Sequence, residues 1–180
     1  LQEIALFESS KTAPGAFTTL QEYVERMPDK QQEIYYLTGE SRAVLEESPL
    51  LETFKKNDVE VLFMTDPIDE WVVQSMTSFQ DKAVKSIAKG DVDVEAIAKD
   101  EEEIKKAKEV AEKEYTELVA FLKDALGDKI KDVKLSRRLT DSPCCLVSDE
   151  ADMGVHMEKI LKAVHKDLPP TKRILEVNPD

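Results

Sequence analysis

The sequence predicts a mixed fold, in which a small parallel α/β unit is followed by an α+β unit with a long helix. The first half alternates apolar runs that suit buried strands with short segments that suit helices. The second half opens on a long amphipathic segment and then mixes strands and helices in another order. With 180 residues, of which 41% are apolar, the chain can bury the core of one large domain or two small ones.

In the first half, the apolar runs 34–37, 59–64 and 83–88 predict three strands. Residues 18–27 predict a short helix that Thr18 or Thr19 caps and Pro28 ends. Ser41 and the pair Ser48-Pro49 are expected to start two more helices between the first two strands. Alternation of strand and helix in this way is typical of a parallel sheet with right-handed crossovers.

After the second strand, Asp66 is expected to cap a helix that has Pro67 at its first position. Helical spacing predicts that this helix buries a stripe of four apolar residues. The stripe consists of Ile68, Val72, Met76 and Phe79.

In the second half, Lys89-Gly90-Asp91 is predicted to open an acidic linker, and residues 100–126 a long helix that Gly127 ends. Strands are expected at 130–135, 144–147 and 173–177, and a helix at 153–166. The long helix is expected to bury one stripe, formed by Ile104, Ala107, Ala111, Tyr115, Leu118, Leu122 and Ala125. We therefore predict two units, residues 1–89 and residues 90–180.

Charge excludes some partners. The chain has 25 basic and 38 acidic residues, a formal net charge of −13, so nucleic acid is not an expected partner. No apolar run reaches the length of a membrane span, and the start lacks the basic leader of a signal peptide. The absent initiator Met predicts that the sequence is part of a longer protein.

The adjacent Cys144 and Cys145 are interpreted as buried structural cysteines in a reducing compartment.

The sequence contains no recognisable catalytic constellation. Gly39 stands alone in its turn, so a Gly-rich phosphate loop is missing. His156 and His165 lie outside any metal-ligand spacing, and helix capping explains Asp66 and Asp69. We therefore expect no catalytic, cofactor-binding or metal-binding residue in this chain.

Two apolar features allow both a structural and a functional interpretation. Trp71, flanked by Glu70 and Gln74, lies at the edge of its helix stripe and suits either a packed rim or a partner contact. The later helix carries a second stripe, formed by Met153, Met157, Ile160 and Val164 with Leu161 beside it. Such a stripe suits a core, but methionines also suit a surface that adapts to varied partners.

Several separate motifs, in order along nearly the whole chain, resemble the ninety-kilodalton heat-shock chaperone family in its bacterial form. They begin near Leu6-Phe7-Glu8-Ser9-Ser10 and end in Leu175-Glu176-Val177-Asn178-Pro179-Asp180. Between them lie Ile34-Tyr35-Tyr36-Leu37-Thr38-Gly39-Glu40-Ser41, Glu60-Val61-Leu62-Phe63-Met64-Thr65-Asp66-Pro67-Ile68-Asp69-Glu70-Trp71 and Arg138-Leu139-Thr140-Asp141-Ser142-Pro143-Cys144.

The resemblance implies the end of the family's middle domain followed by a C-terminal domain without its dimerisation helices. It implies a cytoplasmic heat-shock chaperone that acts as a homodimer, with an ATP and magnesium site upstream of this chain. It further implies contact with unfolded or partly folded client proteins. The residues expected to make that contact are Glu70, Trp71, Gln74, Met153, Met157, Ile160 and Leu161.

Two other classes of function stay open. One is a small acidic α/β enzyme with an unrecognised site, which saturable nucleotide turnover by this chain would favour. The other is an adaptor for one folded partner, which a failure to bind unrelated unfolded chains would favour.

Overall fold

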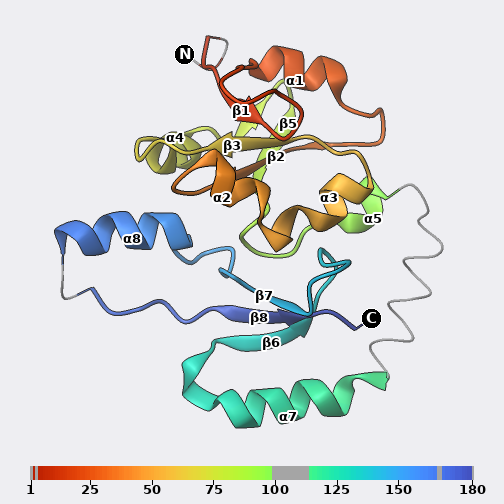
Figure 1. The fold of residues 1–180 in the computed structure, drawn as a ribbon, viewed down its shortest axis with the longest axis vertical. Helices are drawn as coiled ribbons and strands as arrows, with labels where there is room; N and C mark the ends of the chain where they lie inside the picture. The colour runs from red at the N-terminus through yellow and green to blue at the C-terminus, as the bar shows by residue number, and fades with distance from the viewer. Residues whose placement is uncertain (1, 3, 99–113, 166–167, 180) are drawn as a thin grey trace.

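The computed structural model describes residues 2, 4–98, 114–165 and 168–179, which form two β-sheets flanked by helices (Figure 1). A mixed α/β class is therefore confirmed. A five-stranded sheet forms the upper half of Figure 1, and a three-stranded sheet lies below it. Within these described residues, no helix is both long and apolar enough to cross a membrane.

The upper sheet has the strand order β1-β3-β2-β5-β4. Its strands are β1 (Glu8–Ser9), β2 (Glu33–Thr38), β3 (Val61–Met64), β4 (Ser78–Phe79) and β5 (Lys82–Ser86). β2 pairs in parallel with both β3 and β5, which confirms the three strands predicted from apolar runs. β1 and β4 pair antiparallel at the edges, and the sequence does not predict them because two residues show no period.

Helices cover both faces of this sheet. They are α1 (Leu20–Arg26), α2 (Arg42–Glu46), the 3-10 turn η1 (Pro49–Leu51) and α3 (Glu52–Lys56). Ile34 of β2 packs in one cluster with Tyr23 of α1, whereas Tyr35 faces the opposite cluster. There its ring meets Phe54 of α3 edge-on, with ring centroids 4.9 Å apart. The continuously apolar strands thus reflect burial on both sides.

Three of the predicted helix starts in the first half are confirmed. Thr19 accepts a hydrogen bond from the backbone of Glu22, and the Glu22 carboxylate accepts one from the backbone of Thr19. This reciprocal pair satisfies two amides that the first helical turn leaves free. Ser41 caps α2 and Ser48 caps η1 with Pro49 at its first position.

The predicted start of the next helix is wrong. Helix α4 (Asp69–Ser75) begins three residues after Asp66, whose own backbone amide donates to the Asp69 carboxylate at 3.0 Å. Residues 66–69 form a turn, closed by the Asp69 amide on the Asp66 carbonyl at 2.9 Å. Ile68 therefore lies before the helix and is 62% exposed, and Phe79 lies in β4, so the predicted helix stripe is wrong for both residues. Val72 lies in α4, and the buried Met76 lies at its end.

The lower sheet has the order β6-β8-β7, with β6 parallel and β7 antiparallel to β8. Its strands are β6 (Asp132–Leu135), β7 (Cys144–Val147) and β8 (Ile174–Val177). These strands confirm the three predicted runs.

Cys144 is exposed and Cys145 half-buried, both as free thiols, so the buried-cysteine prediction is wrong for Cys144. The two side chains lie on opposite faces of β7, and burial raises the pKa of Cys145 to about 12.

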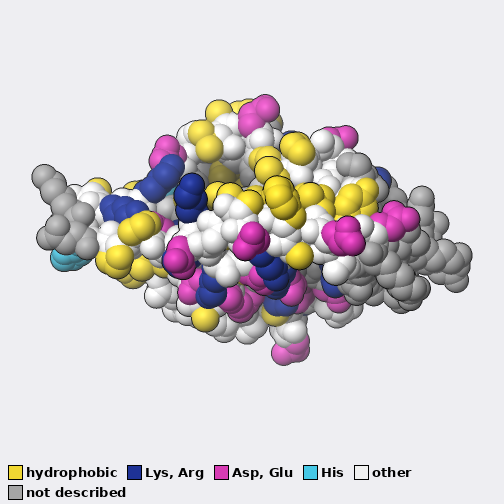
Figure 2. All heavy atoms as spheres, turned by 90° about the horizontal axis from the view of Figure 1, so that it is seen from below, with side chains coloured by type: hydrophobic (Ala, Val, Ile, Leu, Met, Phe, Trp, Pro, Cys, Tyr) yellow, Lys and Arg dark blue, Asp and Glu magenta, His cyan; other side chains and the backbone are white. Residues whose placement is uncertain are grey.

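Helix α7 (Thr116–Leu126) corresponds to the end of the predicted long helix, and Gly127 ends it with a φ of +47°. Ile104, Ala107 and Ala111 lie outside the described residues. The buried stripe is wrong for the rest, because no residue of α7 is buried and Leu118 is 39% exposed. The helix lies against the outer strand β6, at the bottom of Figure 1. Figure 2, seen from below, shows apolar side chains gathered across the middle of that face.

The two sheets share one core. After Gly90 the chain continues into α5 (Val94–Ile97), and Val92, Val94 and Ile97 are buried in the cluster that contains Tyr35. Val147 of β7 and Ile174 of β8 belong to the same cluster. The described part of the predicted linker is therefore packed between the two sheets.

A buried guanidinium joins the sheets by polar contacts. Arg138 lies 2.9 Å from the carboxylate of Glu176 on β8, and the two side chains are 2% and 5% exposed. The same guanidinium donates to the carbonyl oxygens of Ile87 and Gly90, each at 2.5 Å. It therefore fixes the end of the upper sheet's last strand to the middle strand of the lower sheet.

A second connection lies at the start of α3. The Glu52 carboxylate accepts hydrogen bonds from the backbone amides of Thr140 at 2.7 Å, Asp141 at 2.9 Å and Ser142 at 3.2 Å. Burial alone would raise the pKa of Glu52, but hydrogen bonds from Asp141, Ser142 and Thr140 outweigh it and lower the pKa to about 2.

We predict that Arg138→Ala lowers the free energy of unfolding by about 3–5 kcal/mol, because it leaves the Glu176 carboxylate buried without its cation. Arg137→Ala is the matched control, since Arg137 is the exposed neighbour, and it should change stability by less than about 0.5 kcal/mol. Urea denaturation of both variants measures the difference. Equal effects of the two substitutions would contradict the structural role of Arg138.

We predict that the hydrogen bonds of Glu52 make the free energy of unfolding depend on pH in the acid range. The pKa of Glu52 falls from an ordinary 4.5 to about 2 on folding, so its contribution is complete above 4.5 and is lost as the pH falls toward 2. Glu52→Gln should lower stability at neutral pH by roughly 1.5–3 kcal/mol and flatten the decline over that window. Glu47→Gln, which removes an exposed carboxylate, is the control. Parallel declines in wild type and Glu52→Gln would refute the assignment.

Candidate functional site

Helix α8 (Val155–Val164) buries two polar residues, leaves its central apolar residues half-buried and exposes a valine at each end. Its buried residues are His156 and Glu158, whereas Val155 is 46% and Val164 73% exposed. A surface helix ordinarily buries its apolar stripe, whereas Met157, Ile160 and Leu161 of this stripe stay half-buried. Because exposing apolar area in water is unfavourable, such an arrangement marks a surface that suits a partner.

The Glu158 side of α8 is anchored to β8. Arg173, immediately before β8, forms an ion pair with the Glu158 carboxylate and donates to the Ser148 hydroxyl at 2.8 Å. Lys162 approaches the same carboxylate at 2.5 Å. Burial would raise the pKa of Glu158, but Lys162 and Arg173 outweigh it and lower the pKa. The charged side of α8 is thus held inward by specific contacts.

The His156 side of α8 faces α4. Nδ1 of His156 lies 3.2 Å from Oε1 of Glu70, and the two side chains are 8% and 7% exposed. The two atoms do not have the geometry of a hydrogen bond, and neither has a hydrogen-bond partner among the described residues. On the surface, Lys159 approaches Glu40 at 2.7 Å. These contacts place α8 next to α4, at the left of Figure 1.

The predicted contact residues occupy this region with different exposures. Trp71 is 43% exposed, and Gln74 is exposed with its amide donating to the Glu70 carbonyl at 2.9 Å. Glu70 is buried, so its carboxylate is not open to a partner, and its role as a surface contact residue is not supported by its position. The half-buried residues of the set are Met153, Met157, Ile160 and Leu161.

Two residues that the sequence did not predict as contact residues belong to the same region. His156 joins the two helices, but a lone histidine in a helix gives no sign of a partner 86 positions away. Ile68 is exposed because it lies in the turn before α4, and a helical wheel that starts too early places it in the core. Correct placement of the helix start would have found Ile68.

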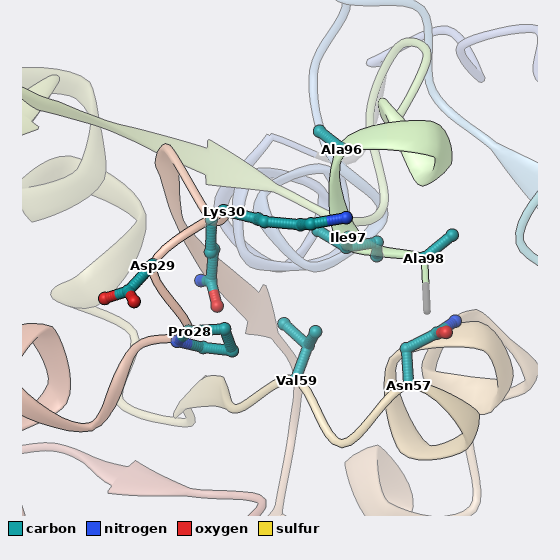
Figure 3. Close-up of a pocket in the computed structure, with 9 residues that line it drawn as sticks. Pro28, Asp29, Lys30, Asn57, Val59, Ala96, Ile97 and Ala98 are labelled. Atoms are coloured by element: carbon teal, nitrogen blue, oxygen red, sulfur yellow. The ribbon is translucent and has the colours of Figure 1, made fainter. Parts of the chain in front are cut away.

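A separate pocket of about 290 Å³ lies between the loops at 28–31 and 57–59 and the helix α5. Its lining residues are Pro28, Asp29, Lys30, Gln31, Asn57, Val59, Ala96, Ile97 and Ala98. Figure 3 shows Lys30 extending toward Ile97 while Asp29 lies at the opposite end. Among the described residues that line it there is no histidine, cysteine or serine. Within the described residues, no group of three His, Cys, Asp or Glu side chains could hold a metal ion.

Comparison with known proteins shows which protein family this chain resembles. A family model described as "Hsp90 protein" matches residues 1–180. "Chaperone protein HtpG" of Geobacter metallireducens is 52% identical over 180 residues, which are 100% of this chain and 28% of that protein. The protein of that name from Geobacter sulfurreducens is 51% identical with the same coverage. The one from Mycobacterium avium is 45% identical over 99% of this chain and 27% of its own length. The chain thus spans little more than a quarter of these relatives.

We predict that stability depends on the polar side of α8 and not on its apolar end. Glu158→Ala should lower the free energy of unfolding by about 3–5 kcal/mol, because Arg173 would stay buried without its carboxylate. Val164→Ser should change it by less than about 0.5 kcal/mol, because that side chain already lies in water. Thermal and urea denaturation of the two variants give the comparison. A larger loss from Val164→Ser would show that α8 packs the other way round.

Proposed function

The chain belongs to the Hsp90 family of chaperones, and from this premise we propose that it is the client-contacting part of a longer, ATP-dependent chaperone. The observation that carries the proposal is the incompletely buried apolar stripe of α8 beside the half-exposed Trp71. A chaperone must hold many sequences, so its contact surface needs apolar area without fixed geometry. The client residues we propose are Trp71, Gln74, Met153, Met157, Ile160 and Leu161, with Ile68 added and Glu70 as their support.

We further propose where this chain lies in the whole protein. Residues 1–89 would form the small αβα end of the middle domain, and residues 90–180 the α+β start of the C-terminal domain with its long helix. The presence of one sheet before residue 90 and a separate sheet after it supports this division. The motifs described above support the assignment to those domains. The whole protein would act as a cytoplasmic homodimer in the heat-shock response.

The described residues do not fit a nucleotide site. The pocket beside α5 has no Gly-rich loop, and no described cluster of carboxylates could hold magnesium. We therefore propose that ATP and magnesium bind to other parts of the whole protein. Saturable binding of ATP to this chain in a calorimeter would instead favour the alternative of a small acidic enzyme.

The proposed contact surface can be exposed without lowering the stability of the fold. Its polar supports, the Glu158–Arg173 pair and the Glu70–His156 contact, lie behind it and do not need the apolar side chains. Methionine adapts its shape through three rotatable bonds, and tryptophan offers the largest apolar area of any side chain. The net charge of −13 keeps an exposed apolar surface soluble.

We predict that Trp71→Arg, and separately the double change Met153→Ser with Met157→Ser, weaken the binding of an unfolded model client several-fold. Truncating a half-exposed contact residue removes binding area, and Trp is often where binding energy concentrates. Stability should change by less than about 1 kcal/mol, since these side chains do not form the core. Fluorescence anisotropy with a labelled, permanently unfolded protein measures the affinity, and thermal denaturation measures the stability.

Phe121→Arg is the control, because Phe121 is 66% exposed on the distant helix α7. It should leave client affinity unchanged. If all three variants weaken binding equally, apolar exposure in general is responsible and not this surface. If stability falls by roughly 2–5 kcal/mol while affinity persists, Trp71 and the methionines are core residues. Binding of one folded protein but no unfolded chain would favour the adaptor function.

A further inference from the structure

The turn that precedes α4 places uncompensated acid beside exposed apolar side chains. Asp66 is exposed and Asp69 is half-buried, and Ile68 between them is 62% exposed. Among the described residues, neither carboxylate has an ion pair with a lysine or arginine. Trp71 follows within one helical turn, its amide bonded to the Ile68 carbonyl at 3.0 Å. Acidic and apolar groups therefore alternate over a few residues.

The acidic groups of this turn repel one another. Burial raises the pKa of Asp69, and the nearby charges of Asp66 and Glu70 raise it further, while His156 acts in the opposite direction. The lysines of α8 do not neutralise the turn, because Lys159 pairs with Glu40 and Lys162 with Glu158. A cation brought by a partner would be attracted to Asp66 and Asp69.

We propose that Asp66 and Asp69 make the α4–α8 surface selective for apolar client segments that carry a lysine or arginine close to their apolar residues. The apolar part of the segment would lie on Ile68 and Trp71, and its cation would lie between the two carboxylates. This inference rests on the proposed function and adds the chemical class of client to it. A segment flanked by acidic residues would meet repulsion here and would find the α8 lysines already paired.

The test uses three short, unstructured, fluorescein-labelled peptides that share one aliphatic–aromatic cluster and differ only in the two flanking residues: lysine, glutamine or glutamate. The chain should bind the lysine peptide about fivefold more tightly than the glutamine peptide, the ratio expected of two exposed ion pairs. The double variant Asp66→Asn with Asp69→Asn should abolish this preference while still binding the glutamine peptide. Asparagine at 69 keeps an acceptor for the Asp66 amide, so the turn is preserved.

The control variant Glu117→Gln with Asp124→Asn removes the same charge from two exposed positions on α7. It should keep the preference, which separates a local effect from the net charge. Raising the ionic strength should reduce the preference in wild type and leave the asparagine variant unchanged.

The outcomes distinguish this inference from the proposed function. If the asparagine variant keeps the lysine preference while Trp71→Arg loses all three peptides, the surface binds clients but Asp66 and Asp69 do not select them. If the control variant loses the preference as well, net charge is the cause and the inference is overturned. If Trp71→Arg binds all three peptides like wild type, the proposed function fails, and the inference fails with it.

Discussion

The arrangement of the two sheets depends on the ion pair and the hydrogen bonds that the buried guanidinium of Arg138 makes. Burying an arginine is unfavourable unless each of its donors finds an acceptor, and here Glu176 and the carbonyls of Ile87 and Gly90 supply them. Since those carbonyls belong to the segment that leaves β5, the lower sheet has one orientation that satisfies the charge. The apolar cluster around Val147 and Ile174 adds stability without such directionality. Polar contacts thus select the geometry, and apolar burial supplies most of the free energy.

The same division between polar and apolar contacts explains how α8 is oriented. Its two buried polar residues, Glu158 and His156, face Arg173 and Glu70, which lie on different elements of the fold. His156 and Glu158 lie on different sides of this ten-residue helix, and the apolar residues between them, Met157, Ile160 and Leu161, are only half-buried. The partial exposure of the stripe thus accompanies the way in which the helix is anchored. An ordinary amphipathic helix would lose its contact surface to the core, whereas this anchoring keeps the surface available at little loss of stability.

The sequence predicts the parts of the fold that local physics decides. β2, β3 and β5 follow from runs buried on both faces, and the caps at Thr19, Ser41 and Ser48 follow from side chains within three residues of their acceptors. Contacts between distant positions decide the rest. The period of α8 reveals a stripe but not whether it faces inward, because Arg173 and Glu70 determine that. At α4, two aspartates three residues apart compete as the start, and the turn that Asp69 stabilises is the one that forms.

That competition has a functional consequence. If the Asp66 side chain capped the helix, its carboxylate would be engaged with helix amides. Because Asp69 instead accepts from the Asp66 amide, the Asp66 carboxylate stays in solvent, close to the exposed Ile68. This turn therefore presents both an apolar and an acidic component of the surface beside Trp71. The chemistry that a client meets at this surface is set by the backbone of a four-residue turn, from Asp66 to Asp69, and the side chains follow from it.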